Sequence, residues 1–453
     1  MTGGVPGRVA VVGGGFLGMT TALGLRRQGF EVCLLERGDV LGGLASSAPV
    51  GPVVWDRFYH VILMSDRRLL ALLGELGLLD EMRWGTTRTG FFSDGRHHRM
   101  STALEFLTFP PLGLIGKARL AATILRASRM SDGLPLEEVP VTAWLEKWSG
   151  RSTLEKIWLP LLRSKLGDNY RLASAAFIWA TIARMYSARR SGLKREMFGY
   201  VDGGCGRIVE KLHRFLLDSG VEVRTGRPVR AVVREQGGVR ITGTSDAGEL
   251  FDAAVLSVPC GAIAQLCPQL TAAESDRLAR VTYQRLVCVT LLLKAPLGDC
   301  YITNITDDGF PFTGVIETTA LVDRERFGGR SLVYLPRYLT GSDRLWELGD
   351  AEILELFLAG IERMYPAFRR DQVDGHTISR AADVCHVPTL RYSAEALPAL
   401  RTSVDGVYVV NAAQIGLGTM NLNEIVAHAE GAVPQVAALL RGAAPAARAE
   451  RTA

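Results

Sequence analysis

The chain has 453 residues, of which 47% are hydrophobic and 22% charged, and its formal net charge is +5. This length suffices for two or three domains, and the composition is that of an ordinary globular protein, which excludes a largely disordered chain. The small positive charge gives no reason to expect a nucleic acid partner. The last residues, 442–453, lack apolar periodicity and are predicted to form a flexible tail.

The first predicted element is a strand, a turn and a helix. An apolar run from Val9 to Val12 predicts a buried strand, and a glycine-rich turn and an amphipathic segment follow it directly. In such a turn one glycine permits the bend, a second lets the backbone approach a pyrophosphate, and a third lets the helix pack closely. The N–H groups at the helix start favour an anion. The residues expected at this phosphate site are Gly13, Gly15, Phe16, Leu17 and Gly18.

A second predicted strand, Glu31 to Leu35, ends at Glu36. A carboxylate at that position is expected to bind a ribose hydroxyl, and it favours a nucleotide without a 2′-phosphate. A glycine fingerprint alone is weak evidence, because such turns also serve packing and NAD enzymes share them. The spacing from Gly13 to Glu36 and the later pair Gly42-Gly43 strengthen the prediction of a nucleotide site.

The middle of the chain predicts a hairpin, then helices, then a second group of strands. Residues 84–100 predict a hairpin that turns at Ser93-Asp94-Gly95, and helical periodicity continues to Gly199. Residues 104–130 mix apolar and basic side chains; we interpret them as helices over an active site, with contact to a bilayer surface as the less favoured alternative. Beyond them, strands are predicted at 283–294, 312–318 and 331–338, and a helix at 350–364.

Two later segments repeat the strand and glycine-turn signals. Residues 199–233 place a Gly-Gly turn before a helix and a strand, and residues 404–440 place a strand before a long helix. Together with Glu36-Arg37 and Gly42-Gly43, they resemble the superfamily that contains amine oxidases, protoporphyrinogen oxidase and phytoene desaturase-type enzymes. This resemblance covers the chain nearly end to end and implies FAD as the cofactor.

The resemblance also implies where FAD would contact the chain. Val229 is expected beside the adenine, and the helix start at Met420, Asn421 and Leu422 is expected at the pyrimidine edge of the flavin. Relatives often have an acid where this chain has Asn411 with Ala412, so we expect Asn411 to donate a hydrogen bond instead. Residues 411–424 contain no cysteine or histidine, and the FAD is therefore predicted to be non-covalent.

The implied fold class is α/β, with a Rossmann-type, glutathione-reductase-like FAD-binding domain and an inserted α+β substrate domain. We expect the FAD-binding domain to be discontinuous, with residues 84–199 as a helical cap and residues 271–390 as the sheet that forms the floor of a substrate cavity. The expected pieces of the FAD-binding domain are 1–83, 200–270 and 391–441.

Two candidate catalytic residues lie in segments that should reach the flavin. His60 follows the Gly42-Gly43 turn, and an imidazole accepts protons near neutral pH; the alternative is a packed histidine at a strand end. Lys165 lies in a segment similar to protoporphyrinogen oxidase-like proteins, where it would anchor an acidic substrate or a water. The alternative for Lys165 is a solvated lysine at a helix end.

Two further candidates lie on the predicted strands. Glu317 ends an apolar strand, so it is interpreted either as half of a buried ion pair with Arg337 or as a base or substrate ligand. Tyr334, with Tyr338, would supply an aromatic pair beside the flavin, although two tyrosines in a strand are more often core residues.

The leading functional prediction is an FAD-dependent oxidase or desaturase that transfers a hydride from a small or medium organic substrate to flavin N5, in a biosynthetic role. A redox-neutral, mutase-like enzyme acting on a nucleotide sugar is the alternative. A basic cluster would suit an acidic or phosphate-bearing substrate, although a solvated helix face explains it more simply. Its members are Arg184, Arg189, Arg190, Lys194 and Arg195. The long insertions argue against a third class, a cofactor-binding protein with a purely structural role.

The seven cysteines indicate the compartment. Their number is odd and no CxxC spacing occurs, so neither a disulfide framework nor a zinc site is expected, and we predict a cytoplasmic protein. The apolar N-terminus is read as the nucleotide-binding strand rather than a signal peptide. No window offers about 20 uninterrupted apolar residues.

Overall fold

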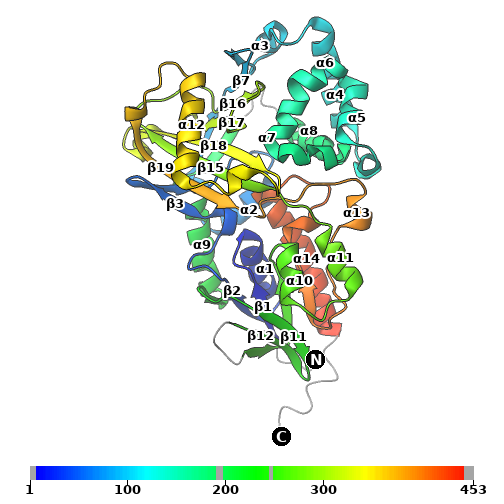
Figure 1. The fold of residues 1–453 in the computed structure, drawn as a ribbon. Helices are drawn as coiled ribbons and strands as arrows, with labels where there is room; N and C mark the ends of the chain where they lie inside the picture. Colours follow the sequence, from blue (N-terminus) through cyan, green and yellow to red (C-terminus); the bar gives the residue numbers. More distant parts are fainter. Residues whose placement is uncertain (1–6, 190–196, 244–247, 443–453) are drawn as a thin grey trace.

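The computed structural model describes residues 7–189, 197–243 and 248–442. Figure 1 shows a sheet flanked by helices near the two termini, a second and larger sheet beyond it, and a group of helices beside the second sheet. The chain passes between these parts several times, so segments that are far apart in the sequence pack side by side.

A five-stranded parallel sheet forms the part nearest the termini, in the order β10-β2-β1-β14-β20. Its central strand, β1 (Arg8–Val12), is apolar from Val9 to Val12 because both of its faces are covered. Val9 and Val11 pack on one side and Ala10 and Val12 on the other. The other strands are β2 (Glu31–Leu35), β10 (Glu222–Arg224), β14 (Ala253–Leu256) and β20 (Val407–Val409).

Different elements cover the two faces of this sheet. On one face pack the helices α1 (Phe16–Arg27), α2 (Arg67–Glu75), α9 (Gly204–Asp218) and α14 (Leu422–Gly442). On the other lie a small antiparallel sheet and two short helices: β11 (Ala231–Glu235), β12 (Gly238–Thr242), β13 (Glu249–Phe251), α10 (Cys260–Leu266) and α11 (Ala272–Ala279). The strands and helices predicted for residues 9–35 and 404–440 are thus confirmed.

The second sheet has seven strands in the order β19-β15-β18-β17-β16-β7-β8. It contains the three strands predicted for the later part of the chain, and α12 (Asp350–Met364), the predicted helix, packs on one face. The strands are β7 (Thr89–Ser93), β8 (Arg96–Arg99), β15 (Arg285–Leu293), β16 (Ile302–Ile305), β17 (Gly314–Glu317), β18 (Ser331–Leu339) and β19 (Val373–Ala381).

The predicted hairpin is present, with a difference in its placement. β7 and β8 pair antiparallel around Asp94 and Gly95, both of which have positive φ. β7 also pairs in parallel with β16, so the hairpin extends the seven-stranded sheet instead of belonging to the helical group that follows it in the sequence.

The helical group has its own core, in which Trp144, Trp158 and Leu162 are buried. Its helices are α3 (Ala103–Thr108), α4 (Leu114–Arg129), α5 (Val141–Ser149), α6 (Arg151–Thr153), α7 (Leu159–Leu166) and α8 (Ala175–Arg189). The remaining short elements are β3 (Ser47–Val50), β4 (Val53–Asp56), β5 (Ile62–Leu63), β6 (Met82–Thr86), β9 (Met197–Val201) and α13 (Tyr392–Glu395).

Within the described residues, no helix is both long enough and apolar enough to cross a membrane. All seven cysteines are free thiols, and five of them are buried.

Candidate functional site

The glycine turn after β1 combines two glycines that the fold itself requires with one that it does not. Gly13 has φ +111°, and a Cβ there would lie 2.5 Å from the carbonyl oxygen of Ser257. A Cβ on Gly18 would lie 1.8 Å from the carbonyl oxygen of Gly13. Gly15 has φ −67°, which any residue adopts, and a Cβ there would meet nothing within 4 Å. Gly15 therefore faces open space at the start of α1.

A second glycine loop meets the first. The N–H of Gly42 donates to the carbonyl oxygen of Gly14 at 2.8 Å, and a Cβ on Gly43 would lie 3.2 Å from the Cα of Gly15. Both Gly42 and Gly43 have positive φ. The two loops therefore leave a backbone-lined cradle at the N-terminus of α1, a position that favours an anionic group such as a phosphate. The side chains of Phe16 and Leu17 are buried beneath it.

Glu36 follows β2, as predicted, and its carboxylate is held by two backbone groups. Oε2 accepts from the N–H of Gly14 at 2.7 Å, and Oε1 accepts from the N–H of Gly38 at 2.8 Å. The carboxylate thus lies next to the glycine turn, and each oxygen keeps a lone pair for a further donor. Arg37 is exposed beside it.

The segment that contains Val229 lies next to Glu36. The N–H of Arg227 donates to the carbonyl oxygen of Glu36 at 2.8 Å, and Val229 is half-buried against the core under the small antiparallel sheet. An apolar side chain is therefore available near the ribose-binding position expected from the sequence.

The C-terminal loop also reaches this region. Asn421 caps α14, because its Oδ1 accepts from the N–H of Glu424 at 3.1 Å, so the predicted helix start at Leu422 is confirmed. Met420 is half-buried beside it. Asn411 is buried, and its Nδ2 donates to the carbonyl oxygen of Val258 at 2.9 Å and contacts Cys260. The Asn411 side chain therefore links the segment after β20 to the segment after β14.

A group of polar side chains meets where the helical group faces the seven-stranded sheet. Nζ of Lys165, at the end of α7, donates to the hydroxyl of Tyr59 at 2.8 Å. That hydroxyl lies 3.2 Å from the hydroxyl of Tyr338 on β18. We call Tyr59, Lys165 and Tyr338 the Tyr59 cluster. Burial raises the pKa of Tyr338 well above its usual value, so this hydroxyl stays protonated.

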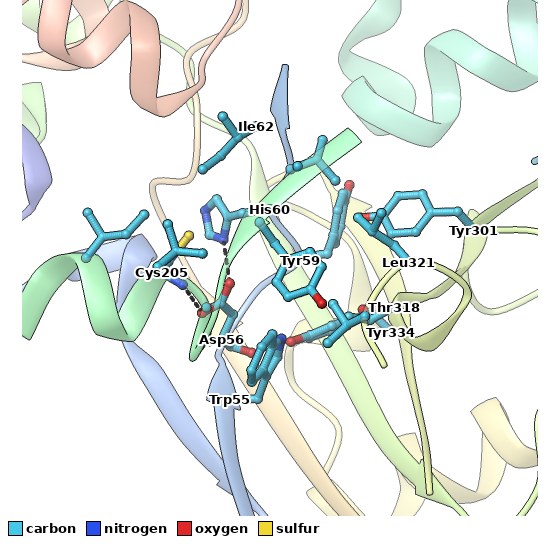
Figure 2. Close-up of a pocket in the computed structure, with 17 residues that line it drawn as sticks. Trp55, Asp56, Tyr59, His60, Ile62, Cys205, Tyr301, Thr318, Leu321 and Tyr334 are labelled. Carbon is cyan, nitrogen blue, oxygen red and sulfur yellow. Dashed lines mark hydrogen bonds and ion pairs between the residues drawn. The ribbon is translucent and has the colours of Figure 1, made fainter. Parts of the chain in front are cut away.

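His60 lies beside the Tyr59 cluster with one nitrogen free to accept a proton. Its Nδ1 is 2.8 Å from the carbonyl oxygen of Phe58. A carbonyl only accepts, so Nδ1 carries the hydrogen and Nε2 of the neutral ring is left as the acceptor. Nδ1 is also 3.9 Å from Oδ2 of Asp56 (Figure 2). The imidazole is 23% exposed, which leaves it accessible to a small molecule.

Asp56 is a buried carboxylate at the N-terminus of α9. Its Oδ1 accepts from the N–H of Cys205 at 2.7 Å and from that of Gly206 at 3.3 Å. Burial raises the pKa of Asp56, while His60 and these amides oppose the shift. A small cavity beside these side chains leaves about 20 Å³ open to a water-sized sphere, room for about one ordered water.

Asp56, His60 and Cys205 also offer three metal-ligand atoms within 4.8 Å of one another. Burial raises the pKa of the Cys205 thiol well above its usual value, whereas a metal binds the thiolate. In addition, two helix amides already donate to Oδ1 of Asp56. The donor set therefore fits a helix cap better than a metal site.

Tyr334 lies on the same face of β18 as Tyr338. Its hydroxyl donates to the backbone carbonyl of Asp56, and its ring centroid is 6.3 Å from that of Tyr59 (Figure 2). Tyr59 therefore packs between the two tyrosines that the sequence had suggested as a pair. No motif in the sequence singles out Tyr59, because it stands beside the apolar run Val61 to Leu63.

Glu317 lies elsewhere, and the expected ion pair with Arg337 is absent from its contacts. Its oxygens accept from the N–H groups of Leu297 at 3.3 Å and Gly298 at 3.0 Å. Arg337 instead pairs with Asp343 at 3.9 Å. The prediction of that partner was wrong because Glu317 is opposite Val333, four residues from Arg337 along β18. Burial raises the pKa of Glu317 to about 7.

The basic cluster is described only in part. Arg184 on α8 pairs with the buried Asp66 at 3.3 Å. The side chain of Arg189 and all of Arg190, Lys194 and Arg195 lie outside the described residues.

Known proteins share this sequence pattern. A sequence profile of the family described as flavin containing amine oxidoreductase matches residues 18–421. The carotenoid phi-ring synthase of Streptomyces griseus is 31% identical over 314 residues, 63% of this chain and 58% of that protein. The putative flavin-containing monoamine oxidase AofH of Mycobacterium tuberculosis is 28% identical over 262 residues, 53% of this chain and 54% of that protein. The chain thus spans little more than half the length of these curated relatives.

Solved structures share the fold over nearly the whole chain. A putative protoporphyrinogen oxidase from Exiguobacterium sp. 255-15 gives a TM-score of 0.75 at 20% identity, covering 95% of this chain and 99% of that one. Putrescine oxidase bound to putrescine gives 0.72 at 17% identity, with 96% and 99% covered. Reduced UDP-galactopyranose mutase gives 0.74 at 14% identity, with 96% of each chain covered. At these identities the likeness concerns the fold alone.

Proposed function

The chain belongs to the family of flavin-containing amine oxidoreductases, and from this premise we propose that it binds FAD non-covalently and oxidises a small or medium organic molecule. The observation that carries the proposal is the cradle at Gly15. Gly13 and Gly18 are required by the fold, whereas Gly15 has an ordinary φ and open space around it, so we attribute this glycine to the close approach of a ligand to the backbone.

Each part of FAD has a proposed contact. The amides at the start of α1 and the Gly42-Gly43 loop would hold the pyrophosphate, Glu36 the ribose, and Val229 the adenine. The loop from Asn411 to Leu422 would lie along the flavin ring, with the N-terminus of α14 facing its pyrimidine edge. When bound, FAD supplies the hydride acceptor at N5.

The Tyr59 cluster and His60 would act on the substrate. The ammonium group of Lys165 and the two phenol groups offer donors that orient a polar substrate atom, and the tyrosine rings exclude water on one side. Nε2 of His60 would accept a proton released by the substrate. Glu317 is not part of this proposal, because its carboxylate accepts from the backbone of Leu297 and Gly298.

We propose the domain division that the sequence suggests. The five-stranded sheet collects strands from 1–83, 200–270 and 391–441, which together would form the FAD-binding domain. Residues 271–390 supply most of the second sheet and residues 84–199 most of the helical group; the substrate would lie between these parts. A location in the cytoplasm remains part of the proposal.

The test is the visible absorption spectrum of the purified protein, recorded before and after anaerobic addition of candidate amines, isoprenoids and nucleotide sugars. A two-banded flavin spectrum that bleaches with one class supports an oxidising enzyme and identifies the class. Flavin that never bleaches, in a protein that converts a nucleotide sugar only after dithionite reduction, would support the redox-neutral alternative. A protein that cannot be reconstituted with FAD would refute both.

A further inference from the structure

Four large aliphatic side chains are exposed together at one end of the helical group. Leu104 is 71% exposed, Leu107 57%, and Leu114 and Ile115 78% each. We call these four residues the apolar tip. They lie on α3 and on the first turn of α4, and Figure 1 places α3 at the end of the molecule opposite the two termini.

The apolar tip is not part of the core of the helical group. Phe109, Leu112 and Leu120, from the same stretch of chain, are at most 3% exposed and fill that core. The four tip residues stay outside although this core is well supplied with apolar side chains. A group of exposed aliphatic side chains of this kind is typical of a surface that contacts a partner or a membrane.

The backbone around the apolar tip is held firmly. Thr102 and Glu105 form a capping box at the start of α3. Nζ of Lys117 donates to the carbonyl oxygen of Leu107 at 2.6 Å, and Nζ of Lys156 donates to that of Pro111 at 3.2 Å. These bonds satisfy carbonyl groups at the turn between α3 and α4, which lowers the cost of moving the turn into an apolar medium.

The chain that carries the apolar tip is mainly basic. Residues 96–130 contain a single acidic residue, Glu105, against six basic residues. The basic residues are Arg96, Arg99, Lys117, Arg119, Arg126 and Arg129. An apolar tip on a mainly basic stretch of chain matches a bilayer whose surface carries anionic headgroups.

We propose that the apolar tip docks on the surface of an anionic lipid bilayer, with its four side chains entering the boundary between headgroups and acyl chains. A protein partner fits less well, because four side chains on two short segments offer far less than the ~800 Å² that each side of a standard protein interface buries. The proposal does not depend on the proposed oxidation chemistry.

The experiment is flotation of the flavin-loaded protein with two kinds of vesicle. One contains phosphatidylcholine only, and the other contains phosphatidylcholine with about one third phosphatidylglycerol. We expect the protein to float with the anionic vesicles, and high salt to release part of it. In Leu114→Asp/Ile115→Asp, the partition coefficient should fall about tenfold or more. Both substitutions lie in the first turn of α4, where an acid is compatible with the helix.

The matched control is Leu217→Asp/Leu356→Asp. These leucines are 50% and 45% exposed on α9 and α12, away from the apolar tip, so this variant should float like the parent. The proposal is overturned if the parent binds neither vesicle, if it binds both equally, or if the tip variant floats like the parent. It is also overturned if size-exclusion chromatography shows a dimer that only the tip variant disrupts, since the occupant would then be a second copy.

Discussion

Nζ of Lys165 lies 2.8 Å from the hydroxyl oxygen of Tyr59, although 106 positions separate the two residues in the sequence. The contact joins the end of α7 to the loop after β4, and Tyr338 of β18 completes it. Three separate parts of the chain thus bring donors to one place, at the junction of the helical group and the seven-stranded sheet.

Replacing Lys165 by Met should slow the reduction of the flavin by substrate about 100-fold, because the ammonium donor that orients the substrate is lost. Stopped-flow absorption under anaerobic conditions measures this rate. Lys147→Met removes another lysine of the helical group, whose Nζ stacks on Trp148, and should leave the rate unchanged. Equal rates in both variants would remove Lys165 from the proposed site.

Gly15→Ala tests the cradle without disturbing the fold. Because its Cβ would meet no atom and its φ is ordinary, the flavin-free protein should keep its Tm, while FAD affinity should fall about tenfold or more. Gly261→Ala is the control, since that Cβ also meets nothing within 4 Å. Fluorescence titration with FAD measures the affinity of both variants. A normal affinity in Gly15→Ala would mean that no phosphate passes this position.

Glu36→Gln should lower the affinity for FAD far more than the affinity for FMN, since FMN lacks the adenosine half that carries the proposed ribose contact. The expected loss for FAD is about tenfold, the value of one charge-assisted hydrogen bond. Titration of the flavin-free protein with each cofactor gives the ratio. If the affinities for FAD and FMN fall by the same factor, or if neither falls, the assignment of Glu36 to the ribose is wrong.

Asp56→Ala should destabilise the protein by about 1–3 kcal/mol, because the N–H groups of Cys205 and Gly206 lose their buried acceptor. Asp56→Asn keeps an oxygen and should lose less. Urea unfolding at neutral pH compares the two variants with the parent. If Asp56→Asn lowers the unfolding free energy as much as Asp56→Ala does, the charge of Asp56 stabilises α9 and its role as an acceptor does not.

Glu317 should make stability fall as the pH rises. Burial raises its pKa from an ordinary 4.5 to about 7, so between these values the folded state holds a proton that the unfolded state has released. The unfolding free energy should therefore fall across this window, by at most roughly 3 kcal/mol. Glu317→Gln should remove this contribution to the pH dependence, measured by urea unfolding at a series of pH values.

His386 has the opposite effect on the pH dependence of stability. Burial lowers its pKa from 6.5 to about 4, so between these values the unfolded state binds a proton that the folded state does not, and the unfolding free energy falls as the pH falls. The quantity to compare is therefore the difference between parent and Glu317→Gln at each pH, in which the contribution of His386 cancels. A difference that does not change between pH 4.5 and 7 would contradict the shift in the pKa of Glu317.

The elements that local pattern determines were predicted well. The strand, turn and helix at residues 9–36 depend on apolar runs and glycines close together in the sequence, and the structure confirms each of them. The superfamily resemblance is confirmed by the family match. The same holds for the helix at 350–364, whose apolar spacing is unambiguous.

The contacts between distant segments were not predicted. The partner of Glu317 depends on the register between β17 and β18, which neither strand encodes alone, and a shift of four residues separates the expected Arg337 from the observed neighbour Val333. The Tyr59 cluster was missed for a similar reason. Each of its residues has an ordinary local explanation, and only the fold brings their polar atoms together.

During synthesis, β1 can pair with β2 early, but it can pair with β14 only much later. Arg8 at its start contacts Asp252, 244 positions later, where β14 begins, and β14 in turn pairs with β20 near residue 407. At about 5–20 residues per second, the ribosome needs tens of seconds to make the intervening chain. The central strand therefore has one unpaired edge for that time, and we expect the five-stranded sheet to be completed only after the strand near residue 407 has been made.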